Sequence, residues 1–167
     1  MPKANNEKII LNEIVEAVHD LFRNRDDMDI TMSEPIADLL VFVDRNQLIR
    51  ILNNLVKNAI QAIPDDRRGK IDIALNKKNH SAIITVKDNG TGIPDYMKQK
   101  VFTPNFTTKN SGTGLGLAIS ANMIDSMNGR IYFDTKIDKG TTFFVEIPLM
   151  RTEQKPKESG TRVSLDD

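Results

Sequence analysis

Cysteine is absent from the 167-residue sequence, and histidine occurs only twice, as His19 and His80. Without cysteine the chain can form no disulfide, no thiolate nucleophile and no Cys-ligated zinc or iron–sulfur site. Two histidines argue against a His-rich metal centre. Long apolar runs are also missing: the longest one near the middle, Leu39–Val43, is far shorter than the roughly 20 residues that a membrane-spanning helix needs.

An excess of charge of one sign is likewise missing, since 23 Lys and Arg residues balance 23 Asp and Glu residues. Proteins that bind nucleic acid through bulk electrostatics need a basic surface, so this balance argues against that class, although it allows a local basic patch. The first six residues lack the apolar stretch of a signal peptide. We therefore expect a soluble, cytoplasmic chain that binds no nucleic acid, with any membrane attachment through segments of a parent protein outside this sequence.

Composition divides the chain into a body and a tail. Residues 151–167 hold four basic and four acidic residues, and their only large apolar side chains are Val163 and Leu165. Such a segment buries too little apolar surface to offset the entropy lost on ordering. We expect one compact domain over residues 1–150, followed by a flexible tail over residues 151–167.

Hydrophobic periodicity predicts helices that alternate with strands early in the chain and paired strands that dominate later. The expected helices cover residues 6–23, 44–63 and about 113–127, and the expected strands cover 28–32, 39–43, 70–76, 81–88, 130–136 and 141–149. Asp44, with Gln47 three residues later, resembles a capping box at the start of the second helix. This order is typical of a two-layer α/β sandwich, in which helices lie on one face of a mixed, mostly antiparallel sheet.

The helix expected over residues 44–63 carries a polar stripe that packing alone does not require. Its members recur at spacings of three or four residues: Gln47, Arg50, Asn54, Asn58 and Gln61. Asparagine is a poor helix-interior residue because its side chain competes for backbone hydrogen bonds. Asn54 and Asn58 offer neutral amide oxygens one turn apart, which suits an Mg²⁺ ion that already carries phosphate oxygens. The alternative is a stripe that merely faces water.

Two glycine-rich segments enclose a long polar loop. The first, residues 88–92, directly follows an apolar strand and begins with Asp88, whose ionised carboxylate could select a ligand with an exocyclic amine, such as adenine. The second, residues 112–117, begins a helix with alternating glycines, which leaves backbone N–H groups free to approach an anion at the positive helix end. This second segment lacks the Gly-Lys-Ser/Thr ending of a Walker A loop and the strand context of a dinucleotide-binding motif.

The loop between the glycine-rich segments has the features of a lid. Residues 96–111 include Lys98, Lys100 and Lys109 and no acidic residue, and they also hold Phe102 and Phe106. Long loops without secondary structure of their own are usually functional, and many close over an active site. We expect the lysines to meet phosphates and the aromatic rings to hold the lid to the body, with a plain surface loop as the alternative.

Together these segments resemble the catalytic, ATP-binding domain of bacterial sensor histidine kinases, within the superfamily that includes gyrase, Hsp90 and MutL. The resemblance covers about residues 6–149 and includes all four sequence boxes in the family's order. The N box matches residues 54–59, the first glycine box 88–92, the F box 102–106 and the second glycine box 112–117. Residues 58–62 and 104–109 look most like the nitrogen-regulation group. The resemblance implies the Bergerat ATP-binding fold.

The resemblance also implies a role for each matching residue. Asp88 is expected to bind the adenine amino group of ATP, and Asn58 to ligate Mg²⁺ with Asn54 close to the phosphates, so the two asparagines are the expected catalytic residues. The remaining expected nucleotide contacts are Gly90, Gly92, Lys109, Gly112, Thr113, Gly114, Leu115, Gly116 and Thr142. Gln61 departs from the pattern, because many relatives carry a basic residue there, and this puts a phosphate contact at that position in doubt.

Neither histidine fits the phospho-acceptor of such a kinase, because His19 lacks the expected sequence context and His80 falls in a predicted turn. The resemblance thus implies a kinase domain that binds Mg-ATP and donates the γ-phosphoryl group to a histidine on a separate helical dimerisation domain, with a response regulator downstream. The isolated chain is not expected to phosphorylate itself. Catalysis is expected to rest mainly on positioning and charge neutralisation.

Two other functions stay open at this point. One is an ATP hydrolase or serine kinase of the gyrase, Hsp90 or anti-sigma type. Such relatives usually have a glutamate one turn before the Mg²⁺ asparagine, whereas this chain has no carboxylate between Asp44 and Asp65 to act as a general base. The other is a module that binds nucleotide without transferring phosphate.

Overall fold

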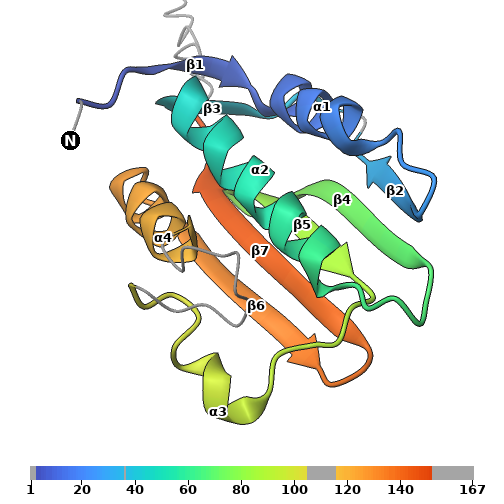
Figure 1. Cartoon of the computed structure of the whole chain (residues 1–167). Coiled ribbons are helices and arrows are strands. Elements are labelled where there is room, and N and C mark those ends of the chain that lie inside the picture. Colours follow the sequence, from blue (N-terminus) through green and yellow to red (C-terminus); the bar gives the residue numbers. More distant parts are fainter. Residues whose placement is uncertain (1–2, 36, 105–115, 152–167) are drawn as a thin grey trace, which may run out of the picture.

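Helices cover one face of a five-stranded sheet in the computed structural model, which describes residues 3–35, 37–104 and 116–151 (Figure 1). The helical layer contains α1 (Leu11–Phe22), α2 (Arg45–Ala62) and α4 (Gly116–Ser126). The strand order is β2-β4-β5-β7-β6, with β2 (Met28–Ser33), β4 (Gly69–Lys78), β5 (Ser81–Asp88), β7 (Gly140–Pro148) and β6 (Arg130–Lys136). β2 and β4 run parallel, and the other neighbours are antiparallel. The expected two-layer α/β sandwich is confirmed.

Aliphatic side chains between α2 and the sheet form the core. Leu48, Leu52 and Leu55 on α2 are fully buried, in one cluster with Ile84 of β5 and Val145 of β7. Burying each such side chain stabilises the fold by roughly 1.5–3 kcal/mol relative to leaving it in water. The apolar stripe of α2 therefore fixes how this helix lies on the sheet.

Strand β5 places its last residue on the helix-covered face of the sheet. Ala82, Ile84, Val86 and Asp88 are buried in alternation with more exposed neighbours. Successive side chains of a strand point to opposite faces, so the Asp88 side chain lies on the same face as the apolar core.

Helix α2 begins where the sequence predicts. The Asp44 carboxylate accepts hydrogen bonds from the backbone N–H groups of Asn46 and Gln47, at 2.9 and 3.1 Å, as an N-cap does. It also accepts one from the N–H of Asn5 at 2.9 Å, which ties the incoming chain to the helix start. The reciprocal half of the capping box does not form, because Gln47 Oε1 is buried without a hydrogen-bond partner.

Residues 6–10 form a strand, so the prediction of helix there was wrong. Strand β1 (Asn6–Ile10) pairs antiparallel with β3 (Leu40–Asp44) in a separate two-stranded sheet, and α1 begins only at Leu11. The β-branched pair Ile9-Ile10 favours extended structure. The paired residues of the two strands are 30 to 38 positions apart in the sequence, beyond the reach of a local periodicity argument.

The loop predicted after β5 contains the one-turn helix α3 (Asp95–Lys98). Residues 113–115, the predicted start of the third helix, and all of the predicted tail except Arg151 lie outside the described residues. None of the helices in the described ranges has the length and apolar character that crossing a membrane demands.

The cap at Asp44 generates a test of stability. We expect Asp44→Ala to lower the free energy of unfolding at pH 7 by about 1 kcal/mol, the usual cost of losing an N-cap. Asp44→Asn should cost less, since an amide oxygen still accepts from the helix N–H groups. Chemical denaturation of both variants measures this, with the exposed Asp65→Ala as control, and an Asp44→Ala variant as stable as that control would contradict the assignment.

The same experiment has a pH dependence. Hydrogen bonds from the backbone of Asn5, above all, and of Gln47 and Asn46 lower the pKa of the Asp44 carboxyl below its ordinary value of 3.8. A lowered folded-state pKa contributes stability that is complete above the unfolded-state value and is lost as the pH falls through the folded-state value. The advantage of the wild type over Asp44→Asn should therefore shrink below about pH 3.8.

Candidate functional site

Asp88 is a buried carboxylate at the end of β5, with 4% of its surface exposed. Its Oδ1 accepts hydrogen bonds from the backbone N–H of Gly90 at 2.9 Å and from that of Thr141 at 3.1 Å. One donor comes from the loop after β5 and the other from the start of β7. Charge-assisted hydrogen bonds from two directions fix the plane in which this carboxylate can accept further donors.

The two predicted glycines of the loop let its backbone approach other segments closely. A Cβ at Gly90 would lie 2.5 Å from the carbonyl oxygen of Ala62, the last residue of α2. The N–H of Thr91 donates to the same oxygen at 3.1 Å. Gly92 has φ +77°, and a Cβ there would lie 2.5 Å from the carbonyl oxygen of Lys136. Only glycine satisfies both requirements at this second position.

Thr141, rather than the predicted Thr142, contacts Asp88. Thr141 is buried, its N–H bonds Asp88, and its Oγ1 lies 2.8 Å from the hydroxyl of Thr135. Thr142 follows on β7 and pairs with Lys87. Strand alternation turns the Thr142 side chain to the opposite face of the sheet, so the structure does not bring it to Asp88.

The asparagines of the predicted Mg²⁺ site lie on α2, half-buried, on the turns that lead to the Asp88 loop. Asn58 precedes Ala62 by one turn, or about 6 Å along the helix axis, and Asn54 precedes it by two turns, or about 12 Å. Ala62 is the residue that contacts the loop after Asp88. Arg50 and Gln61, two other members of the polar stripe, are exposed.

The side chains around Asn54 and Asn58 suit a metal ion that takes most of its ligands from phosphate or water. Within the described ranges, no three His, Cys, Asp or Glu side chains are grouped as metal ligands. The neutral amide oxygens of Asn54 and Asn58 fit Mg²⁺, which takes few protein ligands and keeps phosphate oxygens or waters.

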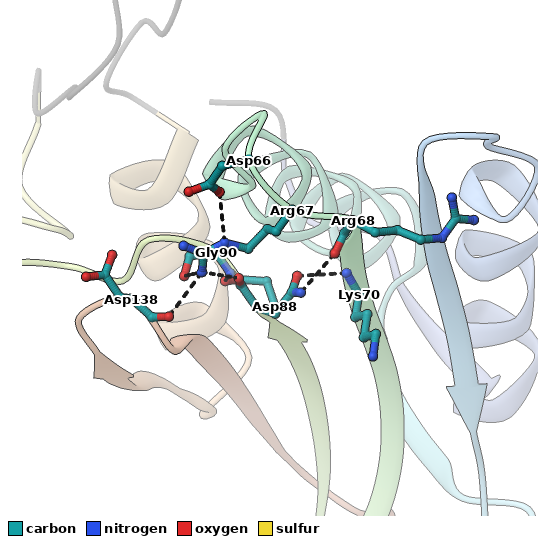
Figure 2. A network of polar contacts seen from close by, with 8 residues as sticks. Asp66, Arg67, Arg68, Lys70, Asp88, Gly90 and Asp138 are labelled. Carbon is teal, nitrogen blue, oxygen red and sulfur yellow. Dashed lines mark hydrogen bonds and ion pairs between the residues drawn. The ribbon is translucent and has the colours of Figure 1, made fainter.

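A side chain that the sequence analysis did not single out closes the loop against β4. Asn89 Oδ1 accepts from the N–H of Lys70 at 2.7 Å, and Asn89 Nδ2 donates to the carbonyl of Arg68 at 3.0 Å. Figure 2 marks these two contacts by the dashed lines that end at Lys70 and Arg68. The side-chain amide of Asn89 thereby makes the pair of backbone contacts that the main chain of a neighbouring strand would make.

Arg67, which the sequence patterns also do not mark as a candidate, lies on the other side of the loop. Its Nη1 donates to the carbonyls of Asn89 at 3.1 Å, Gly90 at 3.4 Å and Asp138 at 3.0 Å (Figure 2). Asp138 belongs to the turn between β6 and β7. No signal in the sequence marks Arg67, because all three acceptors are backbone atoms.

The described part of the predicted lid is held by an aromatic ring. Phe102 is half-buried, with its ring centroid 5.8 Å from that of Phe133 and 6.4 Å from that of Phe143. Lys98 and Lys100 are exposed, and Lys98 forms an ion pair with Asp95 at 2.8 Å. Phe102 thus contacts the body as expected, whereas Phe106 lies outside the described residues.

Several predicted phosphate contacts also lie outside the described residues. They are Lys109, Gly112, Thr113, Gly114 and Leu115. Gly116 is described and is the first residue of α4.

Within the described residues, no hydrogen bond or ion pair joins either histidine to Asp88. His19 is half-buried, and its Nε2 lies 2.8 Å from the carbonyl oxygen of Ile30. His80 is exposed in the turn between β4 and β5. His19 thus makes a structural contact, and His80 is solvent-exposed.

Comparison with known proteins identifies the site's family. The model of the family "Histidine kinase-, DNA gyrase B-, and HSP90-like ATPase" matches residues 43–151. Sporulation kinase A of Bacillus subtilis (strain 168) is 42% identical over 105 residues, which cover 63% of this chain and 17% of that protein. The chain spans between 17% and 27% of the length of sporulation kinases A, B and C of that organism.

Solved structures agree with the fold. The nucleotide-free catalytic domain of the histidine kinase ThkA has a TM-score of 0.77 and 35% identity, covering 86% of this chain and 95% of that one. ThkA in complex with the response regulator TrrA has a TM-score of 0.74 and 32% identity, covering 88% of this chain and 42% of that one. Because the family model covers residues 43–151, which is more than half of the sequence, the chain belongs to the family of histidine kinase-, DNA gyrase B- and HSP90-like ATPases.

Proposed function

We propose that this chain binds ATP with Mg²⁺ and donates the γ-phosphoryl group to a histidine on a separate helical dimerisation domain, with a response regulator downstream. The observation that carries the proposal is the Asp88 carboxylate, which is buried at the end of the central strand β5 and accepts hydrogen bonds from two backbone donors. The relatives of the chain include proteins named sensor histidine kinases, and one similar kinase was solved with a response regulator.

In this proposal Asp88 recognises the base. An ionised carboxylate accepts hydrogen bonds and donates none, so it favours the exocyclic amine of adenine over a carbonyl at the same position. Thr141 replaces Thr142 as the threonine beside the base, because it is the one that contacts Asp88. Gly90 and Gly92 keep side chains out of the loop, so that the backbone can lie close to α2 and β6.

Asn54 and Asn58 serve the other end of the nucleotide. Asn58 supplies an amide oxygen to Mg²⁺, and Asn54, one turn earlier on α2, lies close to the phosphates. The ion, when bound, neutralises charge on the triphosphate. Lys109, the residues from Gly112 to Leu115 and the N-terminus of α4 at Gly116 complete the proposed phosphate contacts.

The lack of carboxylates on α2 favours phosphoryl transfer to a separate histidine over hydrolysis of ATP. Residues 45–62 of this helix include no aspartate or glutamate, so α2 offers no general base for an attacking water. His19 bonds a backbone carbonyl, and His80 is far along the sheet at the opposite end of β5 from Asp88. The acceptor and the group that activates it therefore belong to another domain.

Asp88→Asn tests base recognition. The asparagine keeps an acceptor for the N–H groups of Gly90 and Thr141 but loses the negative charge, so we expect roughly 10- to 100-fold weaker binding of a non-hydrolysable ATP analogue. Isothermal calorimetry with Mg²⁺ measures the affinity. Asp134→Asn, an exposed carboxylate of β6, is the control. Equal affinities of Asp88→Asn and the wild type would refute the role of Asp88.

Asn58→Ala tests the metal ligand. We expect this variant to bind the ATP analogue with the same affinity in the presence and absence of Mg²⁺, because the oxygen that couples the ion to α2 is gone. The control is Asn46→Ala, an exposed asparagine in the first turn of the same helix. A Mg²⁺ dependence as strong as in the wild type would rule out Asn58 as the ligand.

Mixing experiments test phosphoryl transfer. We expect the chain, incubated with γ-labelled ATP and the helical dimerisation domain of its parent kinase, to label that domain with an acid-labile, base-stable phosphohistidine. A version of the acceptor domain with its histidine changed to Gln is the control. Steady release of phosphate without protein labelling would support the hydrolase alternative.

A further inference from the structure

Arg67 joins two chain segments that are distant in sequence. Its Nη1 bonds the carbonyls of Asn89 and Gly90, 22 and 23 residues away, and the carbonyl of Asp138, 71 residues away. Among the described residues no other side chain donates to these three oxygens. One guanidinium nitrogen therefore links the loop after β5 to the turn before β7, beside the backbone hydrogen bond that the Asp138 N–H donates to the carbonyl of Thr91 at 2.8 Å.

These two segments are also the ones that hold the Asp88 carboxylate. The Gly90 N–H belongs to the first segment, and the Thr141 N–H follows three residues after Asp138 in the second. Arg67 thus closes a ring in which each segment gives Asp88 one donor and gives Arg67 at least one acceptor. Figure 2 shows Arg67 above the loop and Asp88 below it. A change in the separation of the segments would turn the carboxylate.

The neighbouring Arg68 provides an internal comparison. Arg67 is the less exposed of the two, at 27% against 52% for the side chain, and its Nε bonds Asp66 at 3.1 Å. Arg68 extends in the other direction (Figure 2). Its Nη2 donates to Asp29 of β2 at 2.9 Å. Two adjacent arginines therefore make charge-assisted contacts of similar length, but only those of Arg67 reach the segments around Asp88.

We propose that Arg67 is a positioning residue that sets base discrimination by fixing the orientation of the Asp88 carboxylate. The proposal rests on the proposed function, in which Asp88 accepts from the adenine amine. Arg67 requires no contact with the nucleotide for this role. Because hydrogen bonds weaken steeply with misalignment, a turned carboxylate loses selectivity for the amine while contacts to the phosphates persist.

The experiment compares the affinity for ATP with that for inosine triphosphate, whose base carries a carbonyl in place of the exocyclic amine. Arg67→Met keeps the side-chain stem and removes every donor, and it should reduce the ATP preference about 10-fold, the usual weight of a charge-assisted hydrogen bond. Arg67→Lys should restore most of the preference, since an ammonium group also donates to carbonyls. Arg68→Met should leave the preference unchanged.

The outcomes separate this inference from the proposed function. A wild type that binds both nucleotides equally would overturn the role of Asp88 in base recognition, and the role of Arg67 with it. A wild type that prefers ATP, with the same preference in Arg67→Met, would overturn the role of Arg67 alone. Equal losses in Arg67→Met and Arg68→Met would also overturn it, because they would indicate general destabilisation.

The energetic coupling between Arg67 and Asp88, measured in a double variant, gives a second readout that a merely structural role of Arg67 would not produce. In an Asp88→Asn background, Arg67→Met should no longer change the ratio of the two affinities, because the group that Arg67 orients has lost its selectivity. A further fall of the ratio in the double variant would contradict the inference. Thermal unfolding of each variant reports folding, and Arg67→Gln, which keeps an amide donor, replaces Arg67→Met if that variant does not fold.

Discussion

The need to satisfy one buried carboxylate governs the architecture around the site. Transfer of a charged carboxylate from water into a protein interior is costly unless hydrogen-bond donors meet it. Asp88 meets this requirement with backbone N–H groups from Gly90 and Thr141, so the chain after β5 must turn back sharply and β7 must begin beside it. The turn brings Gly90 against the end of α2, which in turn brings the asparagine-bearing helix to the carboxylate.

This arrangement couples the two halves of the candidate site through rigid elements. The apolar side of α2 is buried on the sheet, and its last carbonyl bonds the loop after Asp88. Asn58 and Asp88 are therefore separated by one turn of helix and one short loop, both fixed by packing. A ligand that spans them, with an amine at one end and phosphates at the other, would meet groups already in place, which lowers the entropic cost of binding.

Local patterns predicted on which elements the candidate side chains lie. The spacing of Asn54 and Asn58 and the position of Asp88 at a strand end are both readable from the sequence, and so is the order of helices and strands. Features that depend on distant partners were not readable. Strand β1 needs β3 to form, the choice between Thr141 and Thr142 needs the phase of β7, and Arg67 bonds backbone oxygens up to 71 residues away. The local pattern of side chains in the sequence does not indicate any of these distant partners.

A helix without carboxylates constrains the chemistry that this domain can supply alone. Along residues 45–62 the chain offers amide, cationic and apolar side chains but no carboxylate that could take a proton from an attacking group. Phosphoryl transfer depends mostly on alignment and charge, so such a site can deliver the phosphoryl group if its acceptor arrives already activated. Under the proposed function, the acceptor domain must therefore carry both the histidine and the group that orients it. A chain that spans 17% of sporulation kinase A leaves ample length in a parent of that kind for both.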